Sequence, residues 1–187
     1  MTKGQEVKRI GRFALYGSVG FGVGWVFGNA VSFGDVWFPR MVFPGAVGGA
    51  SLGLALKGWK KAGLLAVAGA IGYVLGYMAM MMALFTFGEH WYGIIFNIIA
   101  GAIWGAVTGI SLGLALRNWV WVGVLALAGA AGFGIGWAGY QQFTVQLIQD
   151  TWLPSWIQSA IAFIGWPIVG GAFLGASLGY LEKRRGD

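Results

Sequence analysis

The sequence contains no cysteine and very little charge. Its 187 residues include 12 Lys and Arg, 6 Asp and Glu and one His, so that charged residues make up 10% of the chain. A soluble domain usually carries about 25% charged residues. The absence of cysteine excludes disulfides, thiolate metal ligands and a cysteine nucleophile. The lone His90, next to Glu89, cannot form a zinc site by itself.

The chain is instead rich in apolar residues (58%) and contains 35 glycines. Its charges are confined to short clusters, which separate six charge-free stretches at residues 13–34, 41–56, 62–88, 91–116, 118–149 and 151–181. A charge at the centre of a bilayer costs at least ~2.5 kcal/mol, and a helix needs roughly 17–25 residues to cross one. The sequence therefore predicts an all-α membrane protein with six transmembrane helices in a single domain covering residues 1–187. The second stretch is short, so we expect that helix to extend outward across Pro39 or its Lys57 to snorkel.

The basic residues are divided unequally between the two sides of the predicted membrane. Arg40 falls on one side, and the other eleven fall on the opposite side: Lys3, Lys8, Arg9, Arg12, Lys57, Lys60, Lys61, Arg117, Lys183, Arg184 and Arg185. Basic residues accumulate on the cytoplasmic side of membrane proteins. Both termini are therefore predicted to be cytoplasmic, in a bacterial inner membrane. The formal net charge of +6 then indicates contact with anionic lipid rather than with nucleic acid.

One nine-residue pattern, Gly-Ala-x-x-Gly-x-Ser-Leu-Gly, occurs three times. Its glycines are Gly45, Gly49 and Gly53 in the first copy, Gly105, Gly109 and Gly113 in the second, and Gly171, Gly175 and Gly179 in the third. Glycines spaced by four residues lie along one face of a helix. Three copies of one helical pattern predict an internal repeat.

The other predicted helices share a second pattern, in which an aromatic residue follows two of the three glycines. It places Phe21 and Trp25 in the first helix, Tyr73 and Tyr77 in the third, and Phe133 and Trp137 in the fifth. The chain thus reads as three tandem helical hairpins at approximately 12–57, 62–117 and 119–181. Because each hairpin crosses twice, the repeats are parallel, and we expect pseudo-threefold symmetry about an axis along the membrane normal.

Small residues let helix backbones approach closely in lipid, where little hydrophobic force drives association. We therefore expect the nine glycines of the nine-residue pattern to form the seams of helix contact. Ser51, Ser111 and Ser177 of the same pattern have two readings: hydrogen bonds within the seams, or a ring around a narrow polar passage. Asn29 and Asn97 also have two interpretations: their side chains form hydrogen bonds with nearby backbone groups, or they line a solute path.

No chemistry-bearing motif is recognisable. The glycine-rich segments 20–24 and 132–136 lack the strand, the acidic residue and the Gly-Lys-Ser/Thr context of nucleotide loops. Their glycine pattern is similar to that of the proteolipid ring subunits of rotary ATPases, but those depend on an intramembrane carboxylate that this chain lacks. No acidic or basic residue lies inside any predicted span, which disfavours a proton pump. We expect a protein that is not an enzyme and has no cofactor, metal or catalytic residue.

The segment 141–158 is polar and contains two tryptophans, which is typical of an amphipathic helix at the membrane interface. It is read as a partner-contact surface or as a lid.

Glycine-rich helices that carry Ser-Leu-Gly-Leu-Ala-Leu before a basic turn and Trp, as at 51–59 and 111–119, resemble uncharacterised multi-spanning bacterial membrane proteins. Six crossings with inside termini also resemble the substrate-binding subunits of energy-coupling-factor vitamin importers, which are not expected to show a threefold repeat. The favoured hypothesis is a structural or accessory membrane protein, as a homo-oligomer or within a larger membrane complex. The alternative is a channel or carrier for a small, uncharged solute.

Overall fold

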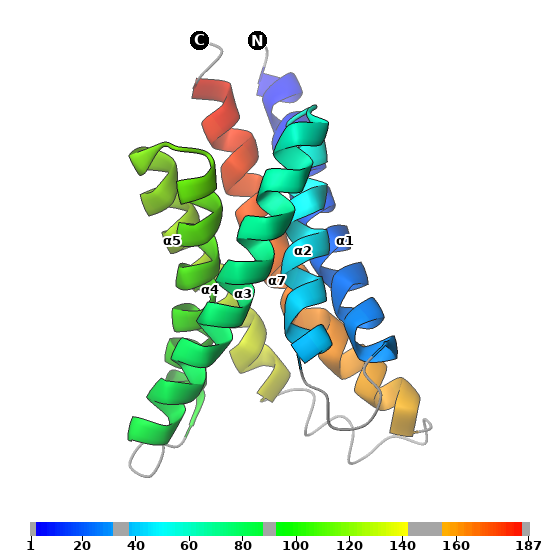
Figure 1. Ribbon diagram of the computed structural model, residues 1–187, viewed down its shortest axis with the longest axis vertical. Helices are drawn as coiled ribbons and strands as arrows, with labels where there is room; N and C mark the ends of the chain where they lie inside the picture. The colour runs from blue at the N-terminus through cyan, green and yellow to red at the C-terminus, as the bar shows by residue number, and fades with distance from the viewer. Residues whose placement is uncertain (1–2, 32–37, 88–92, 142–154, 185–187) are drawn as a thin grey trace.

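The computed structural model describes residues 3–31, 38–87, 93–141 and 155–184. Helices dominate these residues (Figure 1): α1 (Lys3–Ala30), α2 (Phe38–Ala55), α3 (Trp59–Phe87), α4 (Ile94–Ala115), α5 (Trp119–Gly139) and α7 (Ser155–Arg184). Within the described part of the chain, the protein is an all-α structure of six long helices, as predicted.

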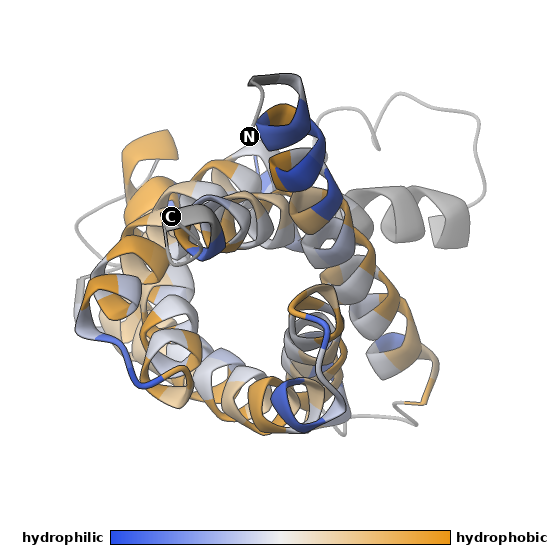
Figure 2. Cartoon of the chain, turned by 90° about the horizontal axis from the view of Figure 1, so that it is seen from above, coloured by the Kyte–Doolittle hydropathy of each residue, from blue (hydrophilic) through white to orange (hydrophobic). Residues whose placement is uncertain are grey.

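The helices form a closed ring. Each helix packs against the next one in the chain, and α7 returns to pack extensively against α1. Viewed from above, the six helices surround a common centre (Figure 2). The two chain ends lie side by side at one end of the ring (Figure 1). The ends of the sequence thus become neighbours, which sequence spacing alone did not predict.

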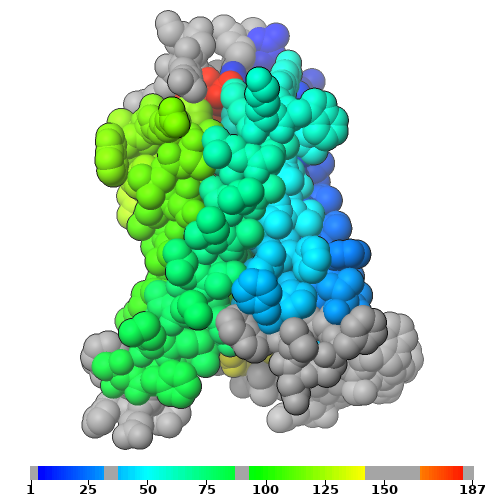
Figure 3. Space-filling model, in the orientation of Figure 1, coloured from blue at the N-terminus to red at the C-terminus, as the bar shows by residue number. Residues whose placement is uncertain are grey.

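Four of the described helices are long and apolar enough to cross a membrane, within Gly4–Ala30, Trp59–Thr86, Ile94–Ala115 and Trp119–Gly139. The helices α2 and α7 complete the ring beside them. Large apolar side chains such as Val67, Leu127 and Ile135 are more than half exposed on the outside. On the face shown in Figure 3, the side chains of α2 and α3 form a continuous surface. An apolar exterior of this kind suits a lipid environment.

The helix boundaries extend past the charge-free stretches. The helix α1 begins at Lys3 and so includes Lys8, Arg9 and Arg12, while α2 begins at Phe38 and carries Pro39 near its start. Charges limit how much of a helix lies in hydrocarbon, but they do not end the helix, and proline is tolerated in the first turn. The expected extension of α2 across Pro39 by Trp37 and Phe38 is therefore observed for Phe38, whereas Trp37 lies outside the described residues.

Local signals explain the two short turns between helices. Asn118 caps α5, because its Oδ1 accepts hydrogen bonds from the N–H groups of Val120 (3.0 Å) and Trp121 (3.3 Å). Before each turn, Lys57 (φ 57°) and Arg117 (φ 53°) adopt the left-handed conformation that often ends a helix. Both turns lie at the end of the ring that carries the chain termini (Figure 1).

Several expectations fall outside the described residues. Glu89, His90 and most of the segment 141–158 belong to this group. Of that segment, the structure describes residue 141 and the start of α7 at Ser155.

Candidate functional site

Three aromatic rings meet at the centre of the helix ring. Phe21 of α1, Tyr73 of α3 and Phe133 of α5 are each 0% exposed. Their ring centroids lie 6.1 Å (Phe21–Tyr73), 5.8 Å (Phe21–Phe133) and 6.0 Å (Tyr73–Phe133) apart. The three centroids therefore form a nearly equilateral triangle, with one ring from each of α1, α3 and α5.

A second group of aromatic side chains packs against this triangle. The Trp166 ring of α7 lies 6.1 Å from Tyr73, 4.5 Å from Trp104 and 5.0 Å from Trp25. Trp104 and Trp166 are 1% exposed. The indole N–H of Trp104 donates a hydrogen bond to the Tyr73 carbonyl oxygen (2.9 Å), which joins α4 to α3. We call the triangle together with Trp25, Trp104, Trp137 and Trp166 the aromatic column.

Three polar atoms in the aromatic column have no hydrogen-bond partner among the described residues. They are the Tyr73 hydroxyl and the indole nitrogens of Trp137 and Trp166. A buried donor without a partner costs about 1–3 kcal/mol, and ordered water often satisfies such groups. The aromatic column is therefore mostly apolar, but three of its polar atoms are still able to form hydrogen bonds.

Sequence reasoning noted the aromatic residues of the glycine pattern without giving them a role, and it missed Trp104 and Trp166. The available signal was the recurrence of an aromatic residue directly after a glycine at one register in three helices. A glycine allows the backbone of a neighbouring helix to approach closely. An aromatic side chain next to such a glycine is therefore placed between packed helices, where a core forms.

The predicted seam glycines lie against the backbone of the following helix in the chain. A Cβ added to Gly45 would collide with the Gly69 carbonyl oxygen of α3, and one added to Gly49 with that of Leu65. The helix pair α4–α5 shows the same arrangement, where Gly105 meets Gly129 and Gly109 meets Leu125. Further along the two pairs, Gly53 meets Ala62 and Gly113 meets Val122.

The same contacts close the ring between α7 and α1. A Cβ on Gly171 would strike the Gly17 carbonyl oxygen, and one on Gly175 that of Phe13. Gly179 lies against the Phe13 side chain. All nine glycines thus occupy contacts between helices of one chain.

Ser51 and Ser111 lie at separate helix contacts of the ring. The Ser51 hydroxyl donates to the Val47 carbonyl oxygen of its own helix (2.9 Å), next to Gly20 of α1. The Ser111 hydroxyl donates across to the Ala68 carbonyl oxygen of α3 (2.6 Å), next to Gly72. Ser177 is half-buried on α7. The centre of the ring is occupied by the aromatic triangle.

The remaining polar candidates differ in their partners. The Asn29 side chain donates to the Trp25 carbonyl oxygen of its own helix (2.8 Å), and Asn97 is half-buried in the first turn of α4. Thr108, which sequence reasoning missed, is 0% exposed. Its hydroxyl donates to the Trp104 carbonyl oxygen (3.0 Å), with the Gly72 carbonyl oxygen of α3 at 3.4 Å.

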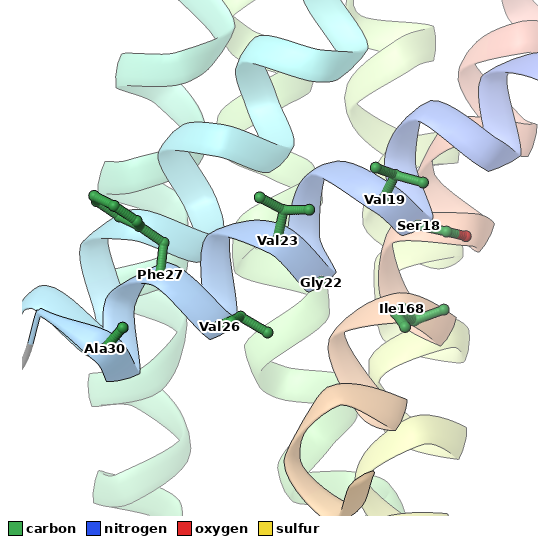
Figure 4. Close-up of a pocket in the computed structure, with 8 residues that line it drawn as sticks. All are labelled: Ser18, Val19, Gly22, Val23, Val26, Phe27, Ala30 and Ile168. Carbon is green, nitrogen blue, oxygen red and sulfur yellow. The ribbon is translucent and has the colours of Figure 1, made fainter. Parts of the chain in front are cut away.

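An apolar groove of about 610 Å³ runs along the outer face of α1. Figure 4 shows that α1 supplies all of its labelled lining residues except Ile168 of α7. Val19, Val23 and Phe27 in this groove are about half exposed. Apart from Ser18, the lining is apolar, and such a groove on the outside of a membrane helix suits a lipid chain.

Among the described residues, no group of three or more His, Asp or Glu side chains could hold a metal ion. No family model, curated protein or solved structure matches the chain. The site must therefore be interpreted from its own geometry.

Proposed function

We propose that this chain is a non-enzymatic structural or accessory protein of the membrane, acting as a homo-oligomer or as a subunit of a larger membrane complex. The observation that carries the proposal is the closed ring with its filled centre. Buried aromatic side chains occupy the place where a pore would run. The glycine seams serve contacts inside the chain, so partners must use the outer surface.

Within this proposal, the chain consists of three tandem parallel repeats, approximately 12–57, 62–117 and 119–181, related by a pseudo-threefold axis. Two observations support it. The central triangle takes one ring from each repeat, at nearly equal distances. The seams α2–α3, α4–α5 and α7–α1 place equivalent glycines against equivalent backbone positions. These seams are glycine zippers in the sense that small residues at every fourth position allow backbone contact.

The proposed topology has six crossings in a bacterial inner membrane, with both termini in the cytoplasm. Its support is the distribution of charge along the ring. Lys8, Arg9, Arg12, Lys57, Lys60, Lys61 and Arg117 gather at the end where the chain termini lie, whereas Arg40 lies in the first turn of α2 at the other end. A basic end of this kind faces the cytoplasm in most membrane proteins.

A second candidate function is a channel or carrier for a small, uncharged solute. It is favoured by the Tyr73 hydroxyl and the Trp137 and Trp166 indole nitrogens, which lack partners in the described structure. Water or a small polar solute passing along the column would satisfy these atoms. This function requires the aromatic side chains to move apart during transport.

Purified protein in liposomes distinguishes the two functions. The structural role predicts that solute and water flux stays at the level of empty vesicles, and that a partner co-purifies in a fixed ratio or the chain forms a defined oligomer. Flux above that of empty vesicles, altered in Trp166→Phe while folding is intact, would instead establish transport. The chain would also need to stay with the vesicles after an alkaline wash, because loss in that wash contradicts membrane insertion.

A further inference from the structure

A cavity of about 280 Å³ lies at the end of the ring that carries the chain termini. It is lined by the N-terminal part of α1, the end of α2 with the turn that follows it, and the end of α7. Phe13 (1% exposed) and Leu56 (5% exposed) form the apolar part of its lining. The charged part consists of Arg9, Arg12, Lys57 and Glu182. We call this cavity the basic pocket.

The basic pocket carries an excess of positive charge. Three cationic side chains face one carboxylate, and no ion pair joins any of these four groups in the part of the chain that the structure describes. Arg9 and Arg12 are three residues apart on α1, which places them on the same side of the helix. The Arg12 guanidinium carbon lies 5.8 Å from the Phe13 ring centroid, which holds this cation beside the apolar lining.

The backbone at Lys57 places a third cation at the pocket. Lys57 has a φ of 57°, and its N–H donates to the Leu54 carbonyl oxygen (2.8 Å). This left-handed position is usually glycine, but here Gly58 comes one residue later. A lysine in this position costs free energy relative to glycine. Arg117 has the same conformation (φ 53°) at the turn between α4 and α5, but it does not line the pocket. It therefore provides a natural control.

We propose that the basic pocket binds a phosphate-bearing anion. Guanidinium groups bind phosphate through paired N–H donors, and the lysine ammonium adds a mobile point charge. Glu182 would repel a second negative charge but would accept a hydrogen bond from a hydroxyl or ammonium group of the ligand. This combination favours a phosphodiester with a small polar head. Two sources carry this chemistry: the headgroup of an anionic phospholipid and a soluble phosphate compound.

The lipid source rests on the membrane placement proposed above, because only then does the pocket lie at headgroup level. Each hydrogen bond from a charged side chain in the pocket to the phosphate is expected to change binding roughly tenfold or more. The double variant Arg9→Gln/Arg12→Gln is thus expected to weaken binding by about 100-fold, and Lys57→Gln by about tenfold. Arg117→Gln is expected to leave binding unchanged.

Two measurements separate the sources. In the first, the protein is extracted from vesicles of phosphatidylcholine and phosphatidylglycerol, and native mass spectrometry counts the retained phosphatidylglycerol. In the second, calorimetry follows the titration of inorganic phosphate into protein in an uncharged detergent. Retained phosphatidylglycerol that phosphate does not displace identifies the lipid headgroup. Phosphate binding that removes the retained lipid or occurs without it identifies the soluble source. For either source, binding must weaken in the Arg9→Gln/Arg12→Gln and Lys57→Gln variants and stay unchanged in Arg117→Gln.

The proposal is overturned if the wild-type protein binds neither probe, or if Arg117→Gln weakens binding as much as Lys57→Gln. Thermal unfolding of each variant checks folding. Should the double variant fail to fold, the exposed Lys57→Gln variant decides. Failure of the membrane placement is recognised separately, because a chain that does not stay with vesicles can still be titrated with phosphate.

Discussion

The backbones of Gly17 and Gly171 meet, although these residues lie near opposite ends of the sequence. A Cβ on either glycine would collide with the carbonyl oxygen of the other. This reciprocal contact has the same form as that between Gly45 and Gly69, which belong to consecutive helices. The ring is therefore closed by the type of contact that joins neighbouring helices elsewhere.

This contact predicts that Gly17→Ala destabilises the protein. The added methyl group must push α1 and α7 apart, and overpacking of this kind costs about 1–3 kcal/mol. Gly11→Ala on the same helix is the matched control, because nothing lies within 4 Å of its Cβ position. Thermal unfolding in detergent should show a lower midpoint for Gly17→Ala alone. Equal midpoints for the two variants would contradict the seam.

The two serines that hydrogen-bond differently provide a second test. Ser111→Ala removes a bond between helices, to the Ala68 carbonyl oxygen, and hydrogen bonds between membrane helices contribute about 0.6 kcal/mol on average. Ser51→Ala removes a bond to its own helix and should cost less. Chemical unfolding of both variants measures the difference. The assignment fails if Ser51→Ala is the more destabilising change.

The left-handed residues before the two turns predict a stabilising change. Lys57→Gly and Arg117→Gly place glycine where φ is positive, which removes strain of the order of 1 kcal/mol. Ala70→Gly, in the interior of α3, serves as the control and should instead destabilise the helix by about 1 kcal/mol. Unfolding midpoints should rise for the first two variants and fall for the third. A fall at Lys57 and Arg117 would argue against the conformation observed there.

The aromatic column predicts a large effect at Trp104. Trp104→Ala leaves a cavity beside Tyr73 and removes the hydrogen bond to the Tyr73 carbonyl oxygen. The expected loss of stability is about 3–5 kcal/mol, whereas the exposed Trp119 (81% exposed) should tolerate alanine. If Trp104 blocks a passage, the folded variant should also increase water flux in liposomes. Unchanged stability would mean that the column is not a packed core.

The proposed topology is tested by labelling single cysteines, which is straightforward because the natural chain has none. Cysteine at Lys60 and cysteine at Arg117 should react with a membrane-impermeant reagent only after cells are opened. Cysteine at Arg40 should react from outside. Opposite sidedness of Lys60 and Arg117 would exclude the parallel repeats.

The glycine pattern indicated a contact face, because a residue without a side chain at every fourth position has few other uses in a helix, and a Cβ on each of its nine glycines would meet a neighbouring helix. It did not predict which helix each seam contacts, since periodicity describes one helix and not its partner. The serines illustrate the same limit. Ser51 and Ser111 occupy equivalent places in the pattern, but Ser51 donates a hydrogen bond within its own helix and Ser111 donates one to the neighbouring α3. Trp104 and Trp166 could not be assigned because the equivalent positions in the other two copies of the pattern are not aromatic. The place of Trp166 in the core depends on how α7 packs against α5, and that of Trp104 on how α4 packs against α3, which only the structure shows.

Closure of the ring by α7 has a consequence for biogenesis. During synthesis the earlier helices leave the ribosome first, and without α7 they form an open arc. In that arc the surface of Phe13 that Gly175 covers, and the Phe21 ring beside Gly171, would face lipid or an insertion factor. Nascent chains halted before α7 should therefore remain accessible to membrane chaperones and proteases, and protection should arrive in one late step when the last helix is inserted.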